Sequence, residues 1–261
     1  MRYVRLFGAY LRANLAAQAA YRINFFFQLV ESLLNLGMSL AGLAIIFSFT
    51  STLGGWRSDE VLGLVGIYFV VGGMIGLIIQ PGLEDLIEAV RTGTLDFLLT
   101  KPEDAQVLVT MQRVEFWKLI DILLGVGILV TALLRLGERV GGGQALAFIA
   151  MLVCGGLIVY SFWLILATLS FWFVRVENIL VVFQSLYEAG RWPVSLYPGW
   201  LRYGLTFIVP VAFATTVPAE ALTGRLDWPT VLLAVGLAAV LLVGSRLFWR
   251  AGLRHYSGAS A

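Results

Sequence analysis

The stretch AVRTGTLDFLLTKPED (Ala89–Asp104) interrupts a chain whose neighbouring segments are strongly apolar. Apolar residues recur at i, i+3, i+4 and i+7 from Leu83 into this stretch, and charged residues occupy the other face, which predicts an amphipathic helix. Gly93 is suited to end that helix, and Thr94 to cap a short second turn. Pro102 then suits the first position of the next long helix. We therefore predict a structured elbow over residues 83–104.

The composition places the chain in a membrane. Of its 261 residues, 59% are hydrophobic and 13% are charged, whereas soluble proteins have about 45–50% apolar and about 25% charged residues. We expect an all-α integral membrane protein with a single domain over residues 1–261. The net charge of +2 is too small to indicate a nucleic-acid partner. With one cysteine and one histidine, the sequence predicts no metal site, bound cofactor or catalytic residue in this chain.

Six segments are apolar over about the 20 residues that a membrane-spanning helix needs. They lie near residues 23–49, 61–82, 106–136, 144–174, 177–197 and 229–250. Before them, Arg5 and Arg12 share one helical face, while Val4 and Leu11 lie on another. This pattern predicts a helix over residues 1–22 that lies in the membrane interface. A plain cytosolic leader is the alternative.

The basic residues predict the orientation of the spans. With both termini in the cytoplasm, twelve Lys and Arg residues fall on the inner side and six on the outer side, as the positive-inside rule requires. We expect a multi-pass protein of the plasma (inner) membrane, surrounded by the lipid bilayer. The elbow then faces the cytoplasm between spans two and three. There it either covers the helix ends or docks a cytosolic partner.

A second irregular region covers residues 190–228 and contains four of the chain's seven prolines. Its apolar part, Tyr203–Val217, is short for a span and is interrupted by Pro210. We predict short re-entrant helices on the outer side, over residues 198–224. A single kinked helix is the alternative.

Two segments, IEAVRTGTLDFLLTKPED (Ile87–Asp104) and RWPVSLYPGWLRYGLTFIVPVAFATTVPAEALTG (Arg191–Gly224), resemble the permease subunits of ABC-2 type transporters. The order of elements is similar to that family over nearly the full length. The resemblance implies a permease subunit of an ATP-driven exporter that pairs with a separate ATPase and a second permease subunit, identical or related. It also implies that the elbow is a coupling helix that docks on the ATPase. By this resemblance the coupling residues are Glu84, Asp85, Glu88, Arg91, Gly93, Thr94, Leu95, Asp96, Lys101 and Pro102.

The sequence contains no G-x-x-x-x-G-K-[ST] motif and therefore no loop of that kind to hold a nucleotide phosphate. The chain is not expected to be an enzyme. ATP and Mg²⁺ are expected to bind to the partner ATPase.

Polar residues form a stripe along the first span, at the helical spacing i, i+4, i+7 and i+11. They are Asn24, Gln28, Glu31 and Asn35. Such a stripe faces protein or water rather than lipid, because polar groups at membrane depth are costly to expose to hydrocarbon. It either lines the translocation path or a subunit interface, or forms a structural hydrogen-bond network.

Other spans carry charged and small residues. We interpret Glu115, Lys118 and Asp121 in the third span as structural helix pairs. Glu188 and Arg191 in the fifth span form either a local ion pair or an exit gate. The Gly72-x-x-x-Gly76 spacing in the second span predicts close helix packing.

Two other functions fit part of the sequence. A secondary transporter driven by an ion gradient would suit the broken outer helices, although no inverted repeat is evident. A membrane scaffold without transport activity is the other alternative. The sequence predicts no particular substrate.

Overall fold

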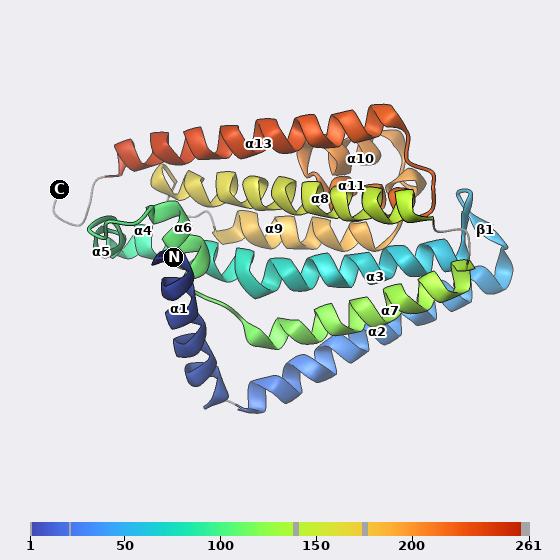
Figure 1. The fold of residues 1–261 in the computed structure, drawn as a ribbon, viewed down its shortest axis with the longest axis horizontal. Coiled ribbons are helices and arrows are strands. Elements are labelled where there is room, and N and C mark those ends of the chain that lie inside the picture. The colour runs from blue at the N-terminus through green and yellow to red at the C-terminus, as the bar shows by residue number, and fades with distance from the viewer. Residues whose placement is uncertain (1, 21, 138–140, 174–176, 257–261) are drawn as a thin grey trace.

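The computed structural model describes residues 2–20, 22–137, 141–173 and 177–256, and their regular structure is almost wholly helical. Long helices lie side by side along one axis (Figure 1). Within the described residues, five helical stretches are long and apolar enough to cross a membrane. They are Ile23–Phe49, Ser58–Thr92, Phe116–Leu136, Gly142–Phe171 and Trp228–His255. An all-α membrane protein is thus confirmed, and a bent helix pair makes six spans if it counts as one.

The first helix, α1 (Arg2–Ala19), lies across the axis of the bundle at the end where the elbow is (Figure 1). A sharp corner separates it from α2 (Arg22–Phe49). The predicted helix over residues 1–22 is thus present as α1; its place in the membrane interface stays a prediction. At the opposite end of the bundle a hairpin of β1 (Thr52–Leu53) and β2 (Trp56–Arg57) connects α2 to α3.

The second span and the start of the elbow form one continuous helix rather than two. It consists of α3 (Ser58–Met74), the π-helical turn η1 (Ile75–Ile79) and α4 (Gln80–Thr92). Pro81 has no N–H to donate to the carbonyl of Leu77, four residues earlier. That carbonyl accepts a hydrogen bond of 2.9 Å from the backbone N–H of Glu115 instead. The proline is therefore accommodated by a wide turn and a tertiary hydrogen bond, and the helix continues.

The predicted glycine stop is confirmed, whereas the predicted threonine cap is wrong. Gly93 takes the left-handed conformation (φ 71°), and its N–H bonds the carbonyl of Val90. The next helix, α5 (Asp96–Leu99), has Leu95 at its N-cap position and no side-chain cap. Thr94 instead shares a hydrogen bond of 2.9 Å with the hydroxyl of Thr92.

The third span begins later than predicted, because the chain after Pro102 makes a short separate helix. Asp104, not Pro102, starts α6 (Ala105–Met111), and its carboxylate accepts a hydrogen bond of 3.0 Å from the N–H of Gln106. Residues 112–115 are not helical. The span then starts with η2 (Phe116–Lys118) and continues as α7 (Leu119–Leu136). We call residues 105–115 the extension of the elbow.

The extension leaves the helix because α1 bonds its backbone. Asn14 Nδ2 donates to the carbonyl of Gln112 at 2.9 Å, and Gln18 Nε2 donates to the carbonyl of Val114 at 2.6 Å. Gln18 Oε1 also accepts from the N–H of Phe116 at 3.0 Å. Side-chain amides of α1 thus replace helical backbone bonds over this stretch.

The fourth span agrees with the prediction, whereas the fifth is broken. Span four is α8 (Gly142–Thr168) with η4 (Leu169–Phe171); the predicted residues 174–176 lie outside the described part of the chain. The predicted span 177–197 is instead α9 (Glu177–Tyr187), η5 (Glu188–Arg191) and η6 (Val194–Leu196). Extended backbone at Trp192, followed by Pro193, ends the helical run. Figure 1 shows α9 within the bundle.

The outer region forms a bent helix pair at the end of the bundle opposite the elbow (Figure 1). Its first arm is α10 (Gly199–Tyr203) with the π-helical η7 (Gly204–Ile208). Its second arm is α11 (Val211–Ala214) with α12 (Thr216–Leu222), and the two arms meet at 70°. The break falls at Pro210, as the sequence indicated. The bent pair fits either re-entrant helices or a single broken span, so the re-entrant helices over residues 198–224 stay a prediction.

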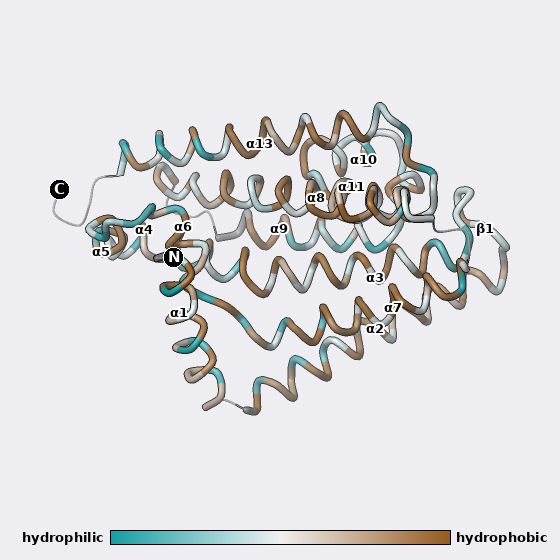
Figure 2. The backbone as a smooth tube through the Cα atoms, in the orientation of Figure 1, coloured by the Kyte–Doolittle hydropathy of each residue, from teal (hydrophilic) through white to brown (hydrophobic). Residues whose placement is uncertain are grey.

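The last helix, α13 (Trp228–His255), returns to the elbow end and packs along α8. Hydrophobic residues dominate the long helices, and hydrophilic residues gather at the elbow end (Figure 2). The most extensive helix packing is between α3 and α7. A Cβ on Gly66 would lie 2.8 Å from the backbone N of Leu129, and one on Gly125 would lie 2.6 Å from that of Val70.

The glycines of the predicted Gly72-x-x-x-Gly76 spacing lie against side chains rather than against the backbone of a neighbouring helix. A Cβ on Gly72 would meet the ring of Tyr187, and one on Gly76 would meet the side chain of Lys118. These two glycines therefore make room for side chains, while Gly66 and Gly73 allow the close approach of the α7 backbone.

Candidate functional site

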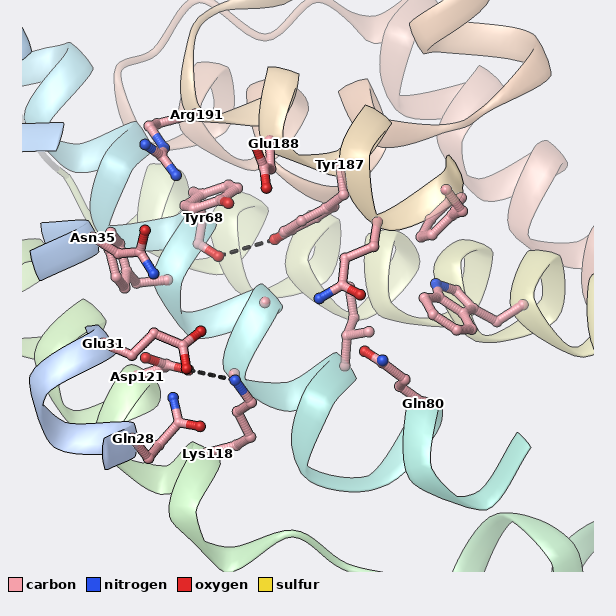
Figure 3. A pocket seen from close by; sticks show the side chains of 17 residues that line it. Gln28, Glu31, Asn35, Tyr68, Gln80, Lys118, Asp121, Tyr187, Glu188 and Arg191 are labelled. Atoms are coloured by element: carbon pink, nitrogen blue, oxygen red, sulfur yellow. Dashed lines mark hydrogen bonds and ion pairs between the residues drawn. The ribbon is translucent and has the colours of Figure 1, made fainter. Parts of the chain in front are cut away.

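A polar cleft of about 160 Å³ opens in the bundle between α2, α3, α7, α8 and α9 (Figure 3). It brings together polar residues that the sequence scatters over four predicted spans. Its polar and charged lining comprises Gln28, Glu31, Asn35, Tyr68, Gln80, Lys118, Asp121, Gln184, Tyr187, Glu188 and Arg191. Three residues of the predicted stripe thus line one cleft with the charged residues of two other spans. Asn24 is exposed and does not line it.

The charges at the elbow side of the cleft are only loosely paired. Lys118 Nζ lies 3.7 Å from Asp121 Oδ2, which is the pairing within the helix that the sequence indicated. Gln28 Nε2 donates to the hydroxyl of Ser32 at 3.1 Å. Glu31 points toward the same space (Figure 3) and makes no hydrogen bond or ion pair with any described residue.

At the other side of the cleft, Arg191 lies over an aromatic ring instead of pairing with Glu188. Its guanidinium carbon is 5.2 Å from the centre of the Tyr68 ring. Tyr68 stacks on Tyr187 with 5.0 Å between ring centres, and Tyr187 donates its hydroxyl hydrogen to the carbonyl of Tyr68 at 2.9 Å. The predicted local ion pair between Glu188 and Arg191 is not formed, so Glu188 keeps its carboxylate free of any described partner.

Two buried N–H groups at the cleft also lack a partner. Trp163 has 1% of its surface exposed, and its Nε1 donates to no described group. The Nε of Arg191 is buried and has no hydrogen-bond partner either. Buried donors of this kind are normally satisfied by protein, water or a ligand. The cleft therefore has both donors and acceptors without a described hydrogen-bond partner. The donors are N–H groups of Trp163 and Arg191, and the acceptors are the carboxylates of Glu31 and Glu188.

The cleft is open to the side and continues toward the elbow. Glu31, Gln184 and Glu188 are exposed, so the lateral opening lies between α2 and α9. A second hollow of about 260 Å³ shares Gln28, Gln80, Lys118 and Gln184 with the cleft and is further lined by Glu84, Arg113 and Glu115. The two hollows meet around Lys118, whose side chain lies against Gly76. The cleft and this hollow are therefore neighbours, and the lining that they share is polar.

The elbow and its extension form the second candidate region, and ion pairs brace them. Arg113 bonds Asp85 of α4 at 2.9 Å and Glu115 at 2.8 Å. Arg246 of α13 makes two hydrogen bonds to the carboxylate of Asp104 and a third, of 2.6 Å, to Gln106 Oε1. These contacts connect the elbow to helices far away in the sequence.

Two further contacts and one pKa shift show how tightly this region is held. Gln106 Nε2 donates to the hydroxyl of Tyr160 on α8 at 3.1 Å, and Lys101 Nζ donates to the hydroxyl of Tyr10 on α1 at 3.2 Å. Hydrogen bonds from Arg246 hold the pKa of the Asp104 carboxyl below its ordinary value. The carboxylate form of Asp104 is thus favoured by the folded structure.

The predicted coupling residues divide into a surface set and a supporting set. Exposed residues are Glu88, Arg91, Thr94, Lys101 and Pro102. Glu84, Asp85, Gly93 and Asp96 are partly covered, and Leu95 is fully buried. Glu84 accepts a hydrogen bond from Gln80, and Asp85 pairs with Arg113. Between the exposed polar residues, Phe97 shows 73% of its surface.

The sequence analysis missed the aromatic residues and two glutamines of the cleft. Gln184, Glu188 and Arg191 stand at i, i+4 and i+7, the same polar stripe spacing that marks α2, so this signal was present. Tyr68, Trp163 and Tyr187 lie in apolar helices, where an aromatic residue gives no indication of a cleft. No local pattern links Arg246 to Asp104, which are 142 positions apart.

Comparison with known families identifies the chain over most of its length. Residues 33–260 match the family model described as "ABC-2 family transporter protein". No curated protein and no solved structure matches the chain.

Proposed function

Because the chain belongs to the ABC-2 transporter family, we propose that it is the permease subunit of an ATP-driven exporter whose separate ATPase subunit binds the elbow. The chain supplies the membrane-spanning helices, and the ATPase binds ATP and Mg²⁺. The protein resides in the plasma membrane with both termini in the cytoplasm.

The exposed Phe97 carries this proposal. It projects from a braced elbow, with Glu88, Arg91 and Lys101 exposed on the same segment. An aromatic anchor with a charged surround is the usual composition of a protein-binding surface. A large aromatic side chain that faced only water would forgo the stabilisation that burial of its apolar surface gives. The ATPase is therefore the proposed cover for this surface.

One continuous helix connects the elbow to the cleft, which supports the proposal that movement of the elbow is transmitted to the cleft. The helix Ser58–Thr92 runs without a break from the far end of the bundle into the elbow. It carries Tyr68 and Gly72 at the cleft and Glu88 and Arg91 at the surface. The ion pair between Asp104 and Arg246 brings α13 into the same unit. Movement of the elbow by the ATPase would thus displace the cleft wall.

A second permease subunit is part of the proposal. The cleft opens sideways between α2 and α9, with Glu31 and Glu188 at the opening. Exposing these carboxylates to lipid tails would be costly. We infer that a second subunit, identical or related, covers this side and completes the translocation path.

Replacement of Phe97 by Ala tests the proposal. We expect the full-length F97A protein to fold and to lose most of its binding to the cognate ATPase, together with ATP-dependent export. F207A is the matched control, because Phe207 is also an exposed phenylalanine but lies in the outer helix pair. Pull-down from membranes and export by proteoliposomes are the measurements. Undiminished ATPase binding by folded F97A would refute the assignment of this surface.

An ion-gradient-driven transporter is the second candidate, because Glu31 and Glu188 lack partners in the cleft. Carboxylates at membrane depth are typical of proton and cation pathways. Transport by the purified chain under an ion gradient, without any ATPase, would favour this function over the first.

A further inference from the structure

We propose that the cleft binds a ligand group with a primary ammonium and a neighbouring acceptor oxygen, such as the headgroup of an aminophospholipid or a free phosphoethanolamine-like amine. The inference rests on the lining of the cleft. It does not depend on the ATPase or on the elbow, so either proposal can fail alone.

The net charge of the cleft favours a cationic ligand. Glu31, Asp121 and Glu188 stand against Lys118 and Arg191, so the formal sum is one negative charge. Asp121 is the acid nearest to Lys118, at 3.7 Å, and the ring of Tyr68 lies under Arg191. The carboxylates of Glu31 and Glu188 are left without a described partner. An ammonium group offers the charge and the N–H donors that such carboxylates accept.

The walls and the carboxylates of the cleft favour an ammonium with N–H donors, of which a primary ammonium has the most, over a quaternary one. Aromatic rings of Tyr68, Phe69, Phe183 and Tyr187 line the cleft, and the faces of aromatic rings attract cations. Rings alone would accept a quaternary ammonium equally well. Carboxylates gain strong hydrogen bonds only from a group with N–H donors, and a quaternary ammonium has none.

The orphan donors indicate an acceptor oxygen on the same ligand. The side chain of Trp163 is 99% covered, and its Nε1, buried at the cleft, has no described hydrogen-bond partner. Arg191 Nε is a second buried donor without a partner. Either donor would be satisfied by an oxygen of a phosphate, ester or hydroxyl group. A bare amine would leave both unmet.

The size and openings of the cleft admit two sources of this group. Its volume of about 160 Å³ is close to the roughly 150 Å³ that holds a benzene molecule, so it takes a headgroup or a small molecule and no lipid tail. Until the second subunit covers it, the lateral opening between α2 and α9 would admit a headgroup whose tails stay in the bilayer. The hollow that leads to the elbow would admit a soluble amine.

Paired probes that differ only in methylation of the amine test the proposal. In the lipid arm, the delipidated full-length protein is titrated with phosphatidylethanolamine or phosphatidylcholine, and bound lipid is measured by native mass spectrometry. In the soluble arm, phosphoethanolamine and phosphocholine are compared by thermal shift. We expect the primary amine to bind at least about tenfold more tightly in one arm, which is roughly the effect of one charge-assisted hydrogen bond. The arm that responds identifies the source.

Variants then assign the preference to the cleft. We expect E31Q and E188Q each to reduce the preference for the primary amine about tenfold. D59N, which neutralises a carboxylate at the start of α3 outside the cleft, should keep it. Equal binding of methylated and unmethylated probes in both arms by the wild type overturns the proposal, and this comparison requires no variant. A preference that survives both glutamine substitutions overturns it as well.

Discussion

The elbow and the cleft both collect charge in this apolar chain, and they use it in opposite ways. Around the elbow, Arg113 and Arg246 are matched to carboxylates of distant segments. In the cleft, Glu31 and Glu188 are matched to nothing described. Paired charges at a surface stabilise a fold modestly, whereas unpaired charges at membrane depth oppose it. The paired charges of Arg113 and Arg246 therefore serve structure, and the unpaired charges of the cleft indicate binding.

Packing also differs between the elbow and the cleft. A substitution that disturbs the packing of the elbow should have the largest effect on stability. A Cβ on Gly82 would lie 2.5 Å from the backbone oxygen of Val109, so G82A forces α4 and α6 apart. We expect a loss of about 2 kcal/mol of stability, as for other overpacked sites, measured as a lower Tm in detergent. G76A is the matched substitution in the hollow beside the cleft, where only the flexible side chain of Lys118 must move. A larger loss for G76A than for G82A would reverse the comparison.

Loss of the ion pair between α13 and the elbow should have the next largest effect. R246Q leaves the carboxylate of Asp104 without its main partner. Both side chains are about one-third exposed, so solvent screening limits the expected loss to about 1 kcal/mol. Urea unfolding and limited proteolysis of the elbow measure it. R250Q, at an exposed position of the same helix, should match the wild type; an equal loss in R250Q would contradict a specific role of the pair.

The ion pair between Asp104 and Arg246 also leads to a prediction of how stability changes with pH. The pKa of Asp104 is lowered in the folded state by Arg246, so its contribution is complete above the ordinary aspartate pKa of about 3.9. That contribution is lost as pH falls through the lowered folded pKa. We expect stability to decrease on acidification below that range, and the decrease to be smaller in D104N. Acid unfolding curves of the two proteins measure this difference, and identical acid limbs would exclude Asp104 as a contributor.

Neutralising a cleft carboxylate should have the smallest effect on stability. Glu31 has no partner to lose, so E31Q is expected to change the free energy of unfolding by less than about 0.5 kcal/mol, as is usual for positions without a structural role. A slight gain is also consistent, since an unpaired charge is removed. Thermal unfolding of E31Q beside R246Q measures the contrast. A loss in E31Q as large as that in R246Q would mean that Glu31 supports the fold.

Much of the fold follows from local pattern. Gly93 ends its helix because only glycine takes the left-handed conformation cheaply. The break at Pro210 is where the sequence placed it. The pattern failed where distant groups competed for the backbone. The predicted boundary between the second span (61–82) and the elbow (83–104) is not a helix end. The carbonyl of Leu77, which Pro81 leaves without a helical donor, accepts from the N–H of Glu115 instead. The third span starts late, because α1 bonds the extension.

The candidate site shows the same division. Spacing along α2 was enough to mark Gln28, Glu31 and Asn35 as one polar face. Spacing did not reveal that Asp121 and Arg191 face them, because that depends on how three helices pack. The spacing of Glu188 and Arg191 indicated a local ion pair or an exit gate, whereas the guanidinium of Arg191 lies over the ring of Tyr68.

The sequence by itself determined that this is a helical membrane protein, with a charged elbow at one end and a broken helix pair elsewhere. Those properties depend on hydrophobicity, helical period, glycine and proline, which act within a few residues of each position. Only the tertiary structure decided that Glu31 and Glu188 share a cleft and that Asp104 is held by Arg246. The reason is physical: whether a charge is paired depends on which helices lie beside it, and helix packing is settled by the whole chain.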